Sequence, residues 1–124
     1  MVDPGWPAIQ RDVLAKVVEP LSQVWFVHDH VQLRFQDAGF TLNNALRLDR
    51  SEGGSIREGE PGFCDALVAL IGARLVGLEH RMGDAFVLHL DEGTDVCVRL
   101  DGDAARGPEA AELPGSVIIF NGEA

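Results

Sequence analysis

The N-terminal part of the chain shows first a helical and then an extended hydrophobic periodicity. Apolar residues recur at i, i+4 spacing from Ile9 onward, and Pro7 suits the first turn of a helix. This pattern predicts an amphipathic helix over about residues 7–18. Pro20 cannot continue the helix, and the β-branched and aromatic run at residues 24–27 predicts a strand.

A hairpin is predicted next, because apolar and polar residues alternate on both sides of the polar stretch at residues 36–39. If those four residues form the loop, Phe35 faces Phe40 and Leu33 faces Leu42. Both apolar sets then lie on one face of the sheet.

The alternation fails shortly after this hairpin, where Asn44 falls on the apolar face. A β-bulge near Asn43 and Asn44 would resolve the conflict. Residues 49–61 contain almost nothing apolar, and we expect them to form a solvated, mobile loop.

A short buried helix is predicted within residues 61–71, ending near Gly72. Three strands should follow it, with turns at residues 82–84 and 91–93.

A three-residue turn at 91–93, with Gly93 in the left-handed conformation, fixes the register of this second meander. It pairs Leu88 with Val96, and it pairs Phe86 with Val98. The same register places His89 opposite Asp95 on the other face.

Taken together, the elements predict an α+β domain over residues 1–124, with two β-meanders that are each preceded by a helix. A last strand at 116–120 follows an acidic connecting segment at 101–115. The closing triplets Leu46-Arg47-Leu48 and Val98-Arg99-Leu100 suggest that the meander is repeated. The meanders can pack as one sheet, as a sandwich or as a partial barrel with the two helices.

The composition argues against two classes of binding partner but does not indicate an activity. Twenty acidic and ten basic residues give a formal charge of −10, which opposes binding to nucleic acid and to anionic membranes. No apolar run approaches the length of a membrane-spanning helix, and no secretory signal is visible at the N-terminus. We therefore expect a cytoplasmic protein with neither partner.

Catalytic motifs are also missing from the sequence. There is no Gly-x-Ser-x-Gly elbow, Cys-x-x-Cys pair, His-Glu-x-x-His helix or phosphate-binding glycine loop. Cys64 and Cys97 are expected to be buried thiols, as is usual for two cysteines in a reducing compartment. The sequence predicts no enzyme and no cofactor.

Two groups of side chains remain as candidate sites. His28 and His30 would share one face of a strand and could offer two imidazoles to a metal, although a third ligand is needed. Asp91, Glu92 and Asp95 would present negative charge to a protein partner, or serve only solubility.

The chain also resembles small bacterial proteins of unknown function with a duplicated β-meander. The motifs that carry the resemblance lie within residues 24–121: the hairpin at 31–48, the apolar run at 66–72, Gly93-Thr94-Asp95-Val96, and the ending Leu113-Pro114-Gly115-Ser116-Val117. The resemblance implies the fold and transfers no catalytic residue.

Two functional hypotheses follow. The first is a non-enzymatic interaction domain that presents acidic loops or an exposed sheet edge to a protein or to a second copy of itself. Because some similar acidic proteins are immunity partners of bacterial toxins, toxin neutralisation is its specific form. The alternative is a small-ligand or metal-binding domain with a site between the meanders.

Overall fold

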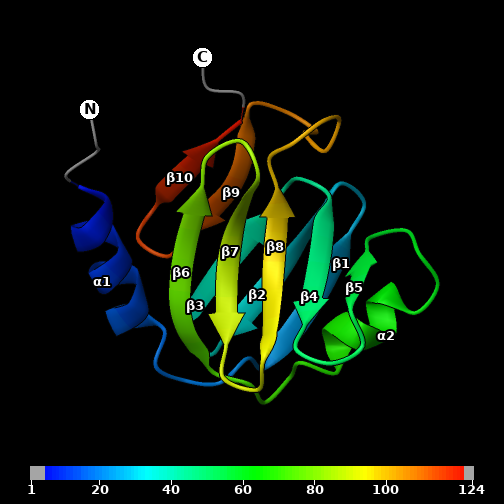
Figure 1. Ribbon diagram of the computed structural model, residues 1–124. Coiled ribbons are helices and arrows are strands. Elements are labelled where there is room, and N and C mark those ends of the chain that lie inside the picture. Colours follow the sequence, from blue (N-terminus) through cyan, green and yellow to red (C-terminus); the bar gives the residue numbers. More distant parts are fainter. Residues whose placement is uncertain (1–4, 122–124) are drawn as a thin grey trace.

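The computed structural model describes residues 5–121, which form a sandwich of two antiparallel five-stranded sheets with two short helices (Figure 1). Neither sheet closes into a barrel. The predicted fold class is confirmed: each of two three-strand meanders is preceded by a helix. Neither described helix has the length and hydropathy that crossing a bilayer requires.

The two halves of the chain share one element order, a helix followed by five strands. The first half contains α1 (Trp6–Lys16), β1 (Gln23–Val27), β2 (His30–Phe35), β3 (Ala38–Leu42), β4 (Leu46–Arg50) and β5 (Ser55–Arg57). The second half contains α2 (Phe63–Val68), β6 (Leu75–Arg81), β7 (Ala85–Leu90), β8 (Thr94–Arg99), β9 (Glu109–Leu113) and β10 (Val117–Phe120).

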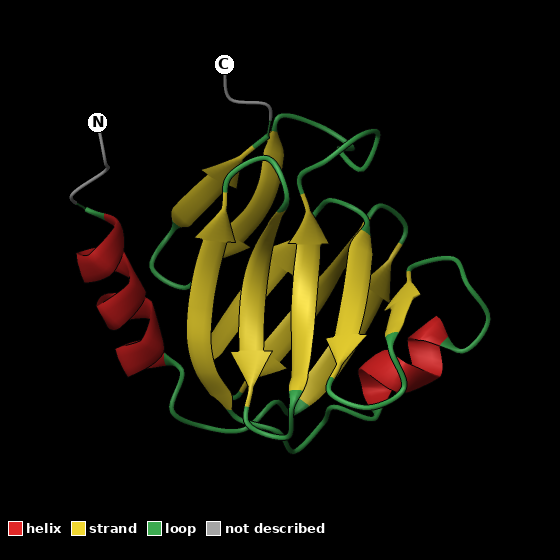
Figure 2. Cartoon of the chain, in the orientation of Figure 1, coloured by secondary structure: helices red, strands yellow, loops and turns green. Residues whose placement is uncertain are grey.

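The halves exchange hairpins. Sheet A has the order β1-β2-β3-β9-β10, so the first meander is extended by the hairpin of the second half. Sheet B has the order β5-β4-β8-β7-β6, so the second meander is extended by the hairpin of the first half. The strands that join the halves are β3 with β9 and β4 with β8 (Figures 1 and 2).

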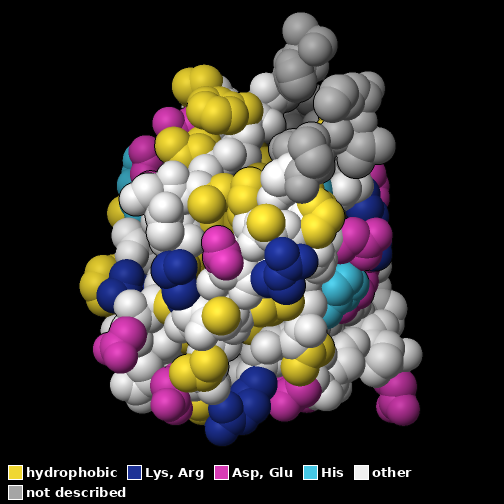
Figure 3. Space-filling model, turned by 90° about the vertical axis from the view of Figure 1, so that its left-hand side faces the viewer, with side chains coloured by type: hydrophobic (Ala, Val, Ile, Leu, Met, Phe, Trp, Pro, Cys, Tyr) yellow, Lys and Arg dark blue, Asp and Glu magenta, His cyan; other side chains and the backbone are white. Residues whose placement is uncertain are grey.

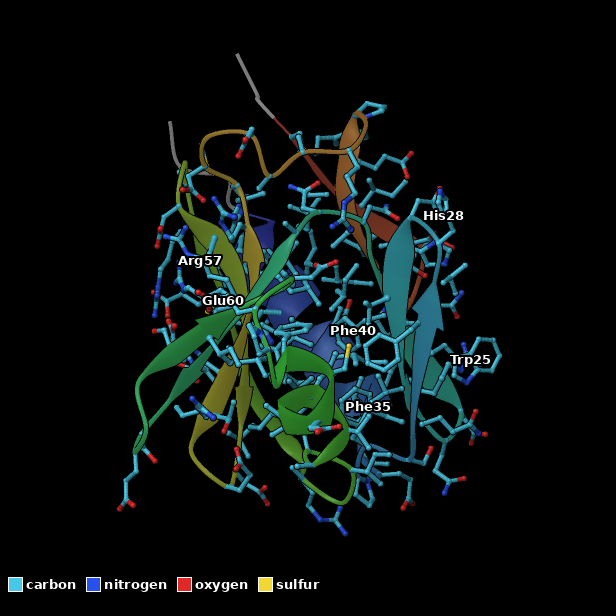
Figure 4. All side chains as sticks on the ribbon, turned by 90° about the vertical axis from the view of Figure 1, so that its right-hand side faces the viewer. Trp25, His28, Phe35, Phe40, Arg57 and Glu60 are labelled. Atoms are coloured by element: carbon cyan, nitrogen blue, oxygen red, sulfur yellow. The ribbon has the colours of Figure 1, made fainter. Side chains whose placement is uncertain are left out.

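The hydrophobic core lies between the two sheets, because alternate residues of each strand point inward. Phe35 and Phe40 of sheet A meet edge to face with their ring centroids 5.8 Å apart. Both rings lie between the sheets in Figure 4. The largest fully buried residues come from both sheets and both helical segments: Phe35, Phe40, Phe86, Leu21, Leu33, Leu42, Leu46, Leu48, Leu67, Leu88, Leu113 and Val13.

The helices close two different sides of the sandwich. Helix α1 lies along the β6 edge of sheet B, where Gln10 Nε2 donates a hydrogen bond to the Leu78 carbonyl at 2.6 Å. Helix α2 lies at the opposite side, near β5 and β1, and buries Phe63 and Leu67 (Figure 2). On the α1 side, hydrophobic and charged side chains are interspersed (Figure 3).

The second meander has the predicted register. Leu88 pairs with Val96, Phe86 pairs with Val98, and Gly93 has the left-handed φ of 102°. The register of this hairpin could be predicted because an acidic turn that ends in glycine permits few hairpin geometries.

The first hairpin is tighter than predicted, with two turn residues instead of four. Phe35 pairs with Ala38 and Leu33 pairs with Phe40. Gln36 adopts a φ of 61°, which allows the short turn without glycine. The shift moves each pairing by two residues, so the predicted apolar face is preserved even though the partners differ.

Asn44 marks a change of sheet, so the predicted bulge is wrong. The chain leaves sheet A after β3 and enters sheet B at β4, and Asn44 is fully buried in this crossing. Its Nδ2 donates to the Arg99 carbonyl at 2.7 Å and to Asn121 Oδ1 at 2.6 Å, while its Oδ1 accepts from Asn121 Nδ2 at 3.0 Å. The asparagine therefore joins three distant segments.

Two segments predicted as connections contain strands. The segment 49–61 includes the end of β4 and all of β5, and the segment 101–115 includes β9. Strand β5 was missed because it has only three residues, and β9 was missed because it is stabilised by the distant strand β3. The mobility of the remaining loop residues stays a prediction. Helix α2 is also shorter than the predicted 61–71.

The Asn44 junction yields a stability prediction. Asn44→Ala removes one hydrogen bond to the Arg99 carbonyl and two to the Asn121 amide, and should lower the free energy of unfolding by about 2–4 kcal/mol. Chemical denaturation measures the change. The control is Asn43→Ala, at a neighbouring part-buried position, for which we expect a loss below about 1 kcal/mol. Equal losses would show that Asn44 has no special role.

Candidate interaction surface

The outer face of sheet B carries a large group of ionisable, hydroxyl and thiol side chains. Strand alternation places them side by side, away from the core: Arg47, Asp49, Ser55, Glu79, Arg81, His89, Asp95, Cys97 and Arg99. Whether this face is a site depends on whether any of these groups is left free to act on a ligand.

His89 is held between two carboxylates. Its Nδ1 lies 2.7 Å from Asp95 Oδ1, as the predicted cross-strand pairing requires, and its Nε2 lies 3.1 Å from Glu79 Oε1. A hydrogen bond from the Arg81 side chain, with one from His89, lowers the pKa of Glu79. Both ring nitrogens of His89 are therefore engaged by carboxylates of neighbouring strands.

Cys97 is also enclosed by its neighbours. Its side chain is fully buried with Ala85 and Val87 beneath the polar groups. Burial, followed by the nearby Asp49 carboxylate, raises the pKa of the Cys97 thiol to about 12. The thiolate is the reactive form of cysteine, so this thiol is a poor nucleophile.

The other polar side chains near Cys97 are hydrogen-bonded to the Asp49 carboxylate. Burial opposes its ionisation, but hydrogen bonds from Arg47 at 2.9 Å and Ser55 at 2.7 Å lower its pKa overall. The Cys97 thiol contacts it at 3.4 Å. The face is therefore a closed network of two groups, one around Asp49 and one around His89, and Arg99 binds Asp101 beside them.

The two cysteines should differ sharply in reactivity. Cys64 is exposed, which corrects the prediction that both thiols are buried; helix α2 turns Phe63 and Leu67 inward and Cys64 outward. We expect Ellman's reagent to modify only Cys64 in the native protein at pH 8, because Cys97 is buried and its thiol pKa is raised to about 12.

The control for this prediction is Cys64→Ser, which leaves Cys97 alone. That variant should react only after denaturant is added. Rapid native modification of Cys64→Ser would mean that the sheet B face opens in solution.

The structure places the predicted metal ligands differently from the sequence argument. His28 lies in the turn between β1 and β2, whereas His30 is the first residue of β2, so the two do not alternate along one strand. His30 Nδ1 lies 2.8 Å from Asp29 Oδ1, and its Nε2 lies 3.2 Å from Gln32 Nε2. Among residues 5–121 no group of three metal-ligating side chains is close enough to hold an ion.

The acidic trio is split between two environments. Asp91 and Glu92 are exposed in the β7–β8 turn and border a shallow hollow of about 390 Å³ that is otherwise lined by residues 69–73. Asp91 Oδ1 accepts a hydrogen bond from the Arg74 backbone at 3.0 Å. Asp95 belongs to the His89 network. Of the three acidic residues, only Asp91 and Glu92 in the turn lie outside the His89 network.

Strand β1 differs from these polar groups because its exposed side chains are apolar. It is an edge strand of sheet A and is paired only with β2. Three consecutive large side chains are exposed on it: Trp25 by 46%, Phe26 by 47% and Val27 by 43%. Figure 4 shows Trp25 projecting from the outer side of sheet A, away from α2.

The Trp25 ring is held in place by its neighbours. Its Nε1 donates to Gln23 Oε1 at 2.7 Å, and the Arg34 guanidinium lies 5.6 Å from the centre of the indole ring. Arg34 also lies over Gly39, where a Cβ atom would be 2.6 Å from its Nη1. Gly39 thus leaves room for the Arg34 side chain, and Arg34 in turn packs over the Trp25 ring. An ordered, exposed tryptophan is typical of the centre of a binding surface.

Sequence reasoning found β1 as a strand but missed its exposure. The available signal was the run Val24-Trp25-Phe26-Val27, which does not alternate with polar residues and carries no charge. Such a run is read equally well as a strand buried on both faces. Only the sheet order shows that this strand lies at an edge.

Comparison with known proteins gives no relative. No family model matches the chain, and no curated protein and no solved structure shows significant similarity to it. The two halves with equal element order are consistent with a duplicated meander. Arguments about function therefore rest on the surfaces described above.

Proposed function

We propose that this chain is a non-enzymatic protein-interaction domain that binds another polypeptide along the β1 edge of sheet A. The observation that carries the proposal is the exposure of Trp25, Phe26 and Val27 on a strand with only one neighbour. Isolated exposed apolar residues are common on proteins, but three in a row on an open sheet edge favour association.

Strand addition explains how such a site would work. An extended segment placed beside β1 would form main-chain hydrogen bonds, which supply affinity for many sequences. Side chains on the two faces of β1 would then select among segments: Trp25 on the outer face, and Phe26 at the margin of the core face.

The closed network on sheet B supports a role without catalysis. His89 and Cys97, the two groups there with catalytic chemistry in other proteins, are engaged by carboxylates or buried. In the alternative hypothesis a ligand would lie between the meanders, but apolar side chains fill the space between the two sheets. Interaction is therefore the better-supported function.

Asp91 and Glu92 suit a steering role within the same proposal. Exposed carboxylates at a turn raise the rate at which a basic protein is encountered without adding much to the affinity. A basic toxin neutralised in the cytoplasm is the specific form of this idea, and it rests on the resemblance to small bacterial proteins.

Native mass spectrometry of untagged protein, purified gently from its own source, tests the proposed function. We expect a polypeptide bound to the chain, either the same chain or another. A chain that carries only a metal or a small molecule would contradict the proposal and support the alternative hypothesis.

Variants locate the contact on the surface. Phe26→Lys should release the bound polypeptide by adding charge to the β1 edge. The control is Phe120→Lys, on the opposite edge strand of the same sheet, where Phe120 is 60% exposed. Release by the Phe120 variant alone would move the site to β10.

A further inference from the structure

Three of the four sheet edges are protected against pairing in the described part of the chain. Strand β5 has three residues and includes Arg57, β6 is covered by α1, and the pairing of β10 with β9 is irregular between Ile119 and Phe120. Short strands, charges, covers and bulges are the usual means of preventing edge-to-edge association.

Strand β1 lacks most of these protections, although α2 lies beside it and Leu21, just before the strand, exchanges backbone hydrogen bonds with Gly72 and Ala73. Its five residues pair with β2 in one unbroken register, and the strand contains no charge, proline or bulge. Helix α2 lies between the two sheets, toward the inner side of the edge (Figure 4).

The sequence of β1 is self-complementary when two copies run antiparallel. With Trp25 facing the Trp25 of the second copy, Val24 faces Phe26 and Gln23 faces Val27. Outer-face residues meet outer-face residues, since Gln23, Trp25 and Val27 share the side of Gln32. Any strand that pairs antiparallel with its own copy has this reciprocity; what β1 adds is a set of aromatic and aliphatic cross-strand pairs, which stabilise antiparallel strands.

Charge favours this strand as the meeting point of two copies. Each chain carries a formal charge of −10, so most approaches of two copies are repulsive. Strand β1 itself carries no charge, so its pairing places no two like charges opposite each other; the charge that lies against it is the Arg34 guanidinium over Trp25. A strongly basic partner would be attracted by the acidic turns and not by this strand.

We infer that the polypeptide bound by β1 is a second copy of this chain, joined by antiparallel β1–β1 pairing into a continuous ten-stranded sheet. The inference rests on the proposed function, because it identifies the partner at the same edge. The exposed parts of the three apolar side chains amount to roughly 250 Å² per copy, well below the about 800 Å² per partner of a stable complex. The dimer therefore forms at high concentration and dissociates on dilution.

Sedimentation of the full chain from about 10 µM to about 1 mM tests the inference in the range where small interfaces dissociate. We expect a monomer that becomes a dimer as concentration rises. Added salt should strengthen this dimer, because it screens the repulsion between two acidic chains. A wild-type monomer at every concentration, or a dimer weakened by salt, overturns the inference.

Variants assign the interface to β1. Phe26→Lys and Trp25→Lys should each weaken dimerisation at least tenfold, since the first places a lysine opposite Val24 and the second places two lysines opposite each other, whereas Phe120→Lys should leave it unchanged. Hydrogen exchange of the wild type gives evidence without mutation: β1 amides should be protected more at high than at low concentration, and β10 amides equally at both. A dimer that survives both β1 variants, or that protects β10 instead, overturns the inference.

Failure of the inference and failure of the proposed function have different signatures. If the wild type stays monomeric but a different polypeptide is released by Phe26→Lys, the second copy is the wrong partner and the interaction site stands. If no polypeptide binds at all, both fail.

Discussion

The fold depends on a reciprocal exchange: neither meander is completed by its own half of the chain. The hairpin β4–β5 extends the second meander, and the hairpin β9–β10 extends the first. The pairing of Leu46 with Val98 and of Leu42 with Ala111 thus ties the halves together twice. Because the core lies between the resulting sheets, its formation requires both exchanges at once.

The segment that crosses from sheet A to sheet B shows how the sequence allows this exchange. A chain that leaves a sheet must satisfy backbone and side-chain polar groups away from any ladder. Asn44 does so at the junction, together with Asn121 from beyond the last strand. A polar residue that breaks an apolar pattern was therefore a sign of a topological change, not of a local irregularity.

Local patterns predicted what local forces determine. The helices, the meanders and the register of the second hairpin follow from periodicity and from the turn that ends in Gly93. Sheet order did not follow, because the β3–β9 and β4–β8 pairings join distant segments with no turn between them. The triplets Leu46-Arg47-Leu48 and Val98-Arg99-Leu100 show the difficulty: they suggested equivalent ends of a repeat, yet β4 and β8 are neighbours in one sheet.

The candidate site was visible only in part for the same reason. The sequence supplied the pairing of His89 with Asp95, but not Glu79, which closes the other side of the ring from β6. The exposure of Trp25 likewise depends on which strands occupy the edges of sheet A. Chemistry within a hairpin can be predicted from a sequence, whereas openness to a partner depends on the whole topology.

The hairpin exchange also determines the order in which the molecule can be assembled. When the first half has been synthesised, β3 and β4 both present unpaired edges, because their partners β9 and β8 lie much later in the chain. Contacts between such distant segments form slowly, since the loop between them must first be closed. The nascent first half therefore passes through a period in which apolar strand edges are open to misassembly, and the second half ends that period by covering them.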